Sequence, residues 1–134
     1  MIDTTLAIHA AGLWSGLLIL LLITLSGVTV SRRRTHMVSF GDGGHAPLAS
    51  ASRAFGNAAE YAPAGMIALV LLALMGAPSL MIHVIGATLL LGRIVHALGL
   101  LFQKGPSLGR MAGMILTYLA LLVAAAAMIA YGVI

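Results

Sequence analysis

Long apolar stretches alternate with short polar ones along the whole chain. Each of four stretches holds about 20 or more mostly apolar residues, the length that a helix needs to cross the hydrocarbon core of a bilayer. The pattern predicts spans over residues 6–30, 52–75, 79–102 and 108–133. The turn between the second and third spans is short, so these two helices are antiparallel. The sequence therefore predicts an all-α membrane protein: one domain, residues 1–134, whose four transmembrane helices form a left-handed antiparallel bundle.

Composition supports the membrane class independently of the pattern. Of the 134 residues, 61% are hydrophobic and 7% are charged, whereas soluble domains carry about 25% charged residues. So few charges cannot cover a surface that faces water. The net charge of +4 comes from only seven basic residues without interleaved aromatic ones, which indicates membrane orientation and no nucleic-acid partner. The absence of cysteine excludes disulfides, thiol catalysis by the protein and cysteine-based metal sites.

Basic residues gather at the first and third connections. Three arginines begin the loop 31–51, and Lys104 lies in the third connection. The positive-inside rule places both connections in the cytoplasm and both termini on the non-cytoplasmic side. No basic residue precedes the first span, so we expect it to remain as an anchor, most simply in a bacterial inner membrane. His36 and His45 lie in a glycine-rich loop without enough other ligands, and we expect no metal site there.

Ionisable residues inside the predicted spans are the strongest functional signal. A charge at the centre of a membrane helix costs about 2.5–3.5 kcal/mol on insertion scales, so such residues normally face protein or water. Arg53, Asn57 and Glu60 are spaced to share one helical face. Arg93 and His96 are three residues apart on the third span and share a face. Both groups are expected at similar depth in the cytoplasmic half.

Glu60 is the only acidic residue predicted inside a span, and Arg93 is its expected counter-charge. One interpretation is an ion pair that only holds two helices together. The surplus of cationic side chains argues for more, because it calls for an anionic ligand. Many small residues in the spans, including Gly92 and Gly99, indicate close packing of helices.

The second and third spans carry a recognisable pattern. The run from Arg53 to Pro63 reads R-A-F-G-N-A-A-E-Y-A-P. It resembles the second-helix signature of the membrane-associated proteins in eicosanoid and glutathione metabolism, the MAPEG family, and matches R-A-x-x-N-x-x-E-Y-x-P at every fixed position. That family includes microsomal glutathione transferases and membrane prostaglandin E synthase. Gly92, Arg93 and His96 resemble the synthase branch.

The resemblance implies a homotrimer that binds glutathione, as co-substrate, between neighbouring protomers near the cytoplasmic face. Arg110, at the start of the fourth span, corresponds to the arginine that stabilises the glutathione thiolate. The groups of glutathione would be held and oriented by residues of the second and third spans: Arg53, Asn57, Glu60, Tyr61, Arg93 and His96. One of the three arginines that follow the first span, Arg32, Arg33 or Arg34, would approach the site as well.

Three functions are weighed. The first is a glutathione transferase, with peroxidase activity as a further expectation, that acts on lipophilic small molecules. The alternative is a non-catalytic MAPEG-like protein that binds a lipid or a partner protein. Leu100 favours this alternative, because glutathione-using members commonly have a tyrosine there, and no other tyrosine is expected near the site. The third is a small transporter in which Glu60 is the coupling carboxylate.

Overall fold

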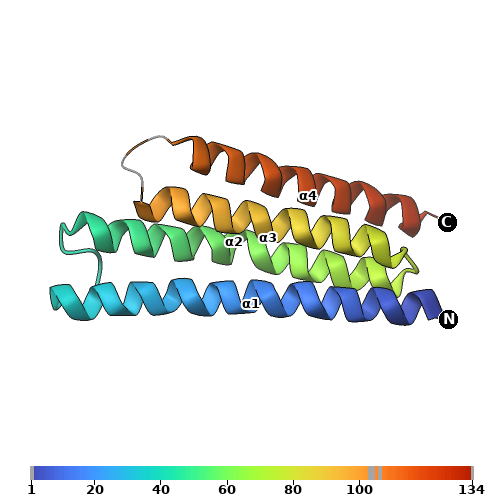
Figure 1. Ribbon diagram of the computed structural model, residues 1–134, viewed down its shortest axis with the longest axis horizontal. Helices are drawn as coiled ribbons and strands as arrows, with labels where there is room; N and C mark the ends of the chain where they lie inside the picture. Colours follow the sequence, from blue (N-terminus) through green and yellow to red (C-terminus); the bar gives the residue numbers. More distant parts are fainter. Residues whose placement is uncertain (1, 103–104, 106, 134) are drawn as a thin grey trace.

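The computed structural model describes residues 2–102, 105 and 107–133 (Figure 1). Within these residues the chain forms four helices that are long and apolar enough to cross a membrane. They are α1 (Ile2–His36), α2 (Ala46–Leu74), α3 (Ser79–Phe102) and α4 (Leu108–Gly132). Consecutive helices run in opposite directions, so the two termini lie at the same end of the bundle (Figure 1). The expectation of an all-helical chain with four spans is confirmed.

The first connection is shorter than the loop 31–51 expected from the sequence. Helix α1 continues through the arginines to His36, since arginine is a good helix former. Helix α2 begins at Ala46, with Pro47 in the first turn, where a proline costs no hydrogen bond. The connection is therefore residues 37–45. The rings of His36 and His45 stack across it, with centroids 4.1 Å apart.

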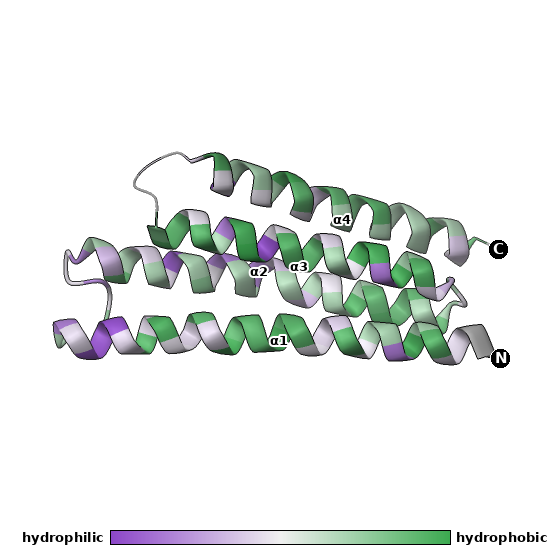
Figure 2. Ribbon diagram, viewed as in Figure 1, coloured by the Kyte–Doolittle hydropathy of each residue, from purple (hydrophilic) through white to green (hydrophobic). Residues whose placement is uncertain are grey.

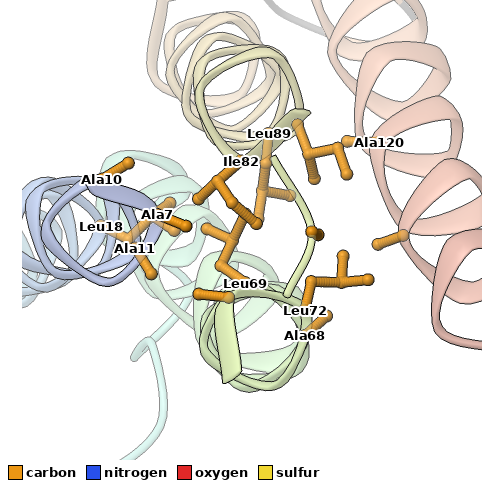
Figure 3. Close-up of a cluster of buried hydrophobic side chains, with 14 of the residues drawn as sticks. Ala7, Ala10, Ala11, Leu18, Ala68, Leu69, Leu72, Ile82, Leu89 and Ala120 are labelled. Atoms are coloured by element: carbon orange, nitrogen blue, oxygen red, sulfur yellow. The ribbon is translucent and has the colours of Figure 1, made fainter. Parts of the chain in front are cut away.

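Helices α2 and α3 occupy the middle of the bundle, with α1 and α4 on opposite sides (Figure 1). Alanine and leucine side chains form the larger core cluster, which includes Leu69 and Leu72 of α2 and Leu89 of α3 (Figure 3). The polar residues of α2 concentrate in the other half of the bundle, next to the α1–α2 and α3–α4 connections (Figure 2). That half is where the sequence predicts the site.

Helices α3 and α4 approach closely through glycines. A Cβ atom on Gly113 would lie 2.5 Å from the backbone nitrogen of His96, and one on Gly92 would lie 2.9 Å from Oγ1 of Thr117. A Cβ on Gly99 would lie 2.7 Å from the backbone nitrogen of Arg110. The expectation of close packing through Gly92 and Gly99 is confirmed, and the helix that they contact is α4. This contact fixes the spacing of the two helices at the site.

Candidate functional site

Arg93 is the centre of a polar cluster between α2, α3 and α4. Its side chain is only 1% exposed. Its Nε donates to Oγ1 of Thr117 (2.8 Å), and one terminal nitrogen donates to Oδ1 of Asn57 (2.6 Å). The other terminal nitrogen donates to the sulfur of Met114 (3.2 Å). A guanidinium buried in this way is held by neutral acceptors, so its positive charge has no carboxylate partner among the residues that the structure describes.

Two tyrosines lie beside this guanidinium. The Cζ atom of Arg93 lies 5.1 Å from the centroid of the Tyr61 ring, within cation–π range. The Tyr61 hydroxyl lies 3.2 Å from the hydroxyl of Tyr118 on α4, and the two rings meet edge to face. Tyr118 is 49% exposed, so the pair of hydroxyls lies where the cluster reaches the surface of the protomer.

The expected contact between Glu60 and Arg93 is wrong. Among the residues that the structure describes, no ion pair joins them, and Glu60 is exposed on the protomer surface. Because a helix turns about 100° per residue, Tyr61 lies about 40° to one side of Asn57 and Glu60 about 60° to the other. Asn57 and Tyr61 therefore face α3 and α4, and Glu60 faces outward. Arg53 is only about 20° from Glu60 by the same geometry and is also exposed.

His96 and Arg110 connect α3 to α4 closer to the third connection than the cluster around Arg93 does. The Nδ1 atom of His96 donates to the backbone carbonyl oxygen of Arg110 (2.9 Å). Ser107 caps α4 by accepting from the backbone N–H of Arg110. A groove of about 280 Å³ is lined by His96, Arg110 and Met114. Since Met114 also accepts from Arg93, the groove joins Arg110 to the polar cluster.

Arg33 lies apart from the cluster. Its side chain donates to the backbone carbonyl oxygens of Ser39 (3.3 Å) and Gly41 (3.0 Å) in the first connection. Arg33 and Arg53 share a depression of about 360 Å³ with Asp42. The structure thus brings Asn57, Tyr61 and Arg93 together and joins His96 and Arg110. It leaves Arg53 and Glu60 on the outer face of α2, and Arg33 beside its own loop.

Thr117 and Tyr118 are functional candidates that the sequence analysis missed. The expectation that no other tyrosine lies near the site is wrong. Helix lengths could have indicated both residues. Arg93 lies nine residues before the end of α3 at Phe102 (102 − 93 = 9), and Thr117 lies nine residues after the start of α4 at Leu108 (117 − 108 = 9). Equal distances from one connection place the two residues at the same depth.

Leu100 occupies the position where a tyrosine was considered. Its side chain is 8% exposed and packs in an apolar cluster with Leu25, Ala54, Ala58 and Ala97. Leu100 also borders a cavity of about 500 Å³ that Arg32 and Arg110 line at this end of the bundle, so a phenol hydroxyl at this position would lie near arginine side chains. The hydroxyl groups near Arg93 come instead from Tyr61 and from Tyr118 on α4.

Comparison with known proteins gives a consistent result. The model of the MAPEG family matches residues 11–130 of the chain. The inner membrane protein YecN of Escherichia coli K12 is 38% identical over 112 residues, which is 84% of each chain. YecN of Escherichia coli O6:H1 strain CFT073 matches with the same identity and coverage. No solved structure matches.

Proposed function

The chain belongs to the MAPEG family, and from this premise we propose that it is a glutathione-dependent membrane transferase that acts as a homotrimer. Its substrates are lipophilic electrophiles, and its location is a bacterial inner membrane, like that of the relative YecN, an inner membrane protein. One observation carries the proposal. The charged side chains of Arg53 and Glu60 are exposed on the same face of a membrane-spanning helix, beside a preformed network around Arg93.

Charged side chains that are exposed on this face of α2 must be shielded from the hydrocarbon of the membrane. Each costs about 2.5–3.5 kcal/mol if it faces hydrocarbon at mid-membrane depth. Glu60 has no ion pair with any residue that the structure describes, and the same holds for Arg53. A neighbouring copy of the chain would remove both side chains from lipid, and a charged ligand at the junction would pair with them. This supports a site that two protomers complete.

Glutathione fits the residues on this face chemically. Its carboxylates pair with arginine in charge-assisted hydrogen bonds, and its amine pairs with a carboxylate. Arg53 is available for a carboxylate of the tripeptide, and Glu60 is available for the amine. Arg93 holds Asn57 in a fixed orientation, so the amide of Asn57 keeps its remaining groups for the peptide. The arrangement can therefore fix both ends of one ligand.

Arg110 supplies the charge for the reacting sulfur. A guanidinium near a thiol favours the thiolate, which is the nucleophilic form. The thiol proton passes to solvent, and the thiolate forms a carbon–sulfur bond to an electrophile that diffuses in from the membrane. The bond from that carbon to its leaving group breaks, and the leaving group departs as an anion with the bonding electrons. The groove beside His96 and Met114 connects Arg110 to the lipid-facing side of α3 and α4. The non-catalytic alternative shares the architecture and differs by an absence of this turnover.

Glutathione binding tests the proposal directly. We expect wild-type protein in detergent to bind glutathione and Glu60→Gln to bind it at least about tenfold more weakly, because one charge-assisted contact is lost. Asp42→Asn is the matched control. It also removes a carboxylate, but one that accepts from the N–H of Gly44 and shares a depression with Arg53, so its loss should not weaken the binding of an anionic ligand. Isothermal titration calorimetry of the three proteins gives the affinities. Equal affinity of wild type and Glu60→Gln would refute the proposed site.

Tyr118 is expected to contribute to turnover through its hydroxyl group, which lies with that of Tyr61 beside the charged side chain of Arg93. Tyr118→Phe should lower kcat about 10- to 100-fold, the range for loss of a hydrogen bond to a charged group, with a smaller change in KM. Tyr131→Phe, at the opposite end of α4, makes the same chemical change away from the cluster and should keep full activity. Steady-state conjugation assays measure both. Full activity of Tyr118→Phe would assign the tyrosine pair to packing alone.

A further inference from the structure

A hydrogen bond joins α1 to α3 in the half of the bundle away from the candidate site. Nε1 of Trp14, on α1, donates to Nδ1 of His83, on α3 (3.0 Å). The two rings meet edge to face, with centroids 6.1 Å apart and an angle of 81° between their planes. His83 lies ten residues before Arg93 (93 − 83 = 10), which is about 15 Å along α3. The contact is therefore separate from the cluster around Arg93 and lies toward the end that carries both termini (Figure 1).

The chemistry of the two rings fixes the protonation state of His83. The indole nitrogen of tryptophan carries a hydrogen and can only donate. Nδ1 of His83 must therefore accept with a free lone pair, and the hydrogen of the neutral imidazole is then on Nε2. A protonated imidazole carries hydrogen on both nitrogens, so two N–H groups would face each other. The hydrogen bond to Trp14 exists only while His83 is neutral.

Packing also holds Trp14 against α3. A Cβ atom on Gly86, one turn after His83, would overlap Cγ of Trp14, so the indole ring lies directly against the backbone of α3. The same ring packs against the larger core cluster, which includes Ile82 and Ile85 of α3. Because the ring fills this space, an indole that moves away from His83 must also change the contact between α1 and α3.

His83 lies where protons from water can reach it. Its side chain is exposed on the protomer. It is four residues after Ser79, the first residue of α3 (83 − 79 = 4), and thus only about 6 Å along the helix from that end. The positive-inside rule predicts that this end of the bundle faces the non-cytoplasmic side. A proton taken up by His83 would then come from outside the cytoplasm.

Few ionisable groups surround this contact in the part of the chain that the structure describes. The segments 62–74 of α2 and 84–92 of α3 contain none. On α4, Tyr131 is the ionisable residue at this end, and it packs against the core cluster. On α1, His9 lies about 140° around the helix from Trp14, and Asp3 lies about 16 Å from Trp14 along the helix axis. A charged His83 would therefore have no neighbouring carboxylate among these groups to hold it in place.

We propose that the hydrogen bond between Trp14 and His83 is an acid-sensitive link between α1 and α3. Neutral His83 holds the indole, and protonation of His83 breaks the hydrogen bond and loosens α1 at this end of the bundle. Histidine suits this role because its charge changes between about pH 5 and 8. The link depends on the contact of α1 with α3 alone and operates with or without glutathione.

Trp14 is the single tryptophan of the chain, so tryptophan fluorescence of the purified protein in detergent reports on this contact. Lowering the pH from about 8 to about 5 should weaken the wild-type emission and shift it to longer wavelength, because a charged imidazole quenches a neighbouring indole and the released ring meets more water. His83→Asn should lose this response, since its Oδ1 replaces Nδ1 as acceptor and does not take up a proton. His9→Asn removes the other histidine at this end and should keep the response.

Amide hydrogen exchange tests whether α1 is loosened. At about pH 5 the part of α1 around Trp14 should exchange faster in wild type than in His83→Asn, and at about pH 8 the two proteins should agree. An unchanged wild-type emission would overturn the proposal without any variant. A pH response that persists in His83→Asn, or disappears in His9→Asn, would assign the titration to another group and also overturn it. Equal exchange of the two proteins at the lower pH would disprove the link to α1.

Discussion

Replacing Gly113 by alanine is expected to push α4 away from α3 and to destabilise the protein severely. The added Cβ would lie 2.5 Å from the backbone nitrogen of His96 and 2.7 Å from the carbonyl oxygen of Gly92, so no side-chain movement can make room for it. Overpacking of this kind costs about 1–3 kcal/mol or more. The shift would also break the hydrogen bond from Arg93 to Thr117 that spans the two helices. Thermal unfolding in detergent measures the loss of stability, and calorimetry measures the accompanying loss of glutathione affinity.

Gly12→Ala is the control for this prediction. A Cβ atom on Gly12, in α1, meets nothing within 4 Å. Alanine in a helix interior is about 0.5–1 kcal/mol more favourable than glycine, so this variant should unfold at the same temperature or higher. Similar unfolding temperatures for Gly113→Ala and Gly12→Ala would contradict the role assigned to the close contact of α3 and α4.

Arg110→Gln is expected to lower kcat/KM for glutathione conjugation by about 100-fold or more, the usual effect of removing a group that stabilises charge at the reacting centre. Glutamine keeps a polar side chain but carries no charge to hold the thiolate. The reaction to follow is glutathione with chlorodinitrobenzene. The thiolate forms a carbon–sulfur bond, the carbon–chlorine bond breaks, chloride leaves, and the thiol proton passes to solvent. Absorbance of the conjugate reports the rate.

The relative changes in kcat and in glutathione affinity distinguish a role of Arg110 at the sulfur from a role in binding. Because Arg110 is assigned to the sulfur, its loss should lower kcat more than it weakens glutathione binding. Arg34→Gln removes an exposed arginine elsewhere at the same end of the bundle and should keep full activity. Full activity of Arg110→Gln would move the thiolate-stabilising role to another cation. An absence of turnover in the wild type, with glutathione still bound, would favour the non-catalytic alternative.

The polar residues of α2 show what residue spacing along one helix can predict about a site and what it cannot. Spacing along one helix correctly placed Arg53, Asn57 and Glu60 within about 60° of one another. It did not reveal that the boundary between buried and exposed surface runs through this group. Asn57 meets Arg93, whereas Glu60 lies outside. Spacing along one helix gives the angles between its side chains around the helix axis. Which of these side chains faces the interior depends on how the helix packs against α3 and α4.

Fold class, the approximate positions of the spans and the half of the bundle that holds the polar residues are determined by the sequence alone, because apolar length and charge placement can be read along the chain. The partners of Arg93 were decided only by the tertiary structure. They depend on how far each helix is rotated about its axis and on how closely α4 approaches α3, which the contact at Gly92 and Gly113 sets. Packing between side chains of different helices fixes these quantities, and no periodicity within one helix contains them.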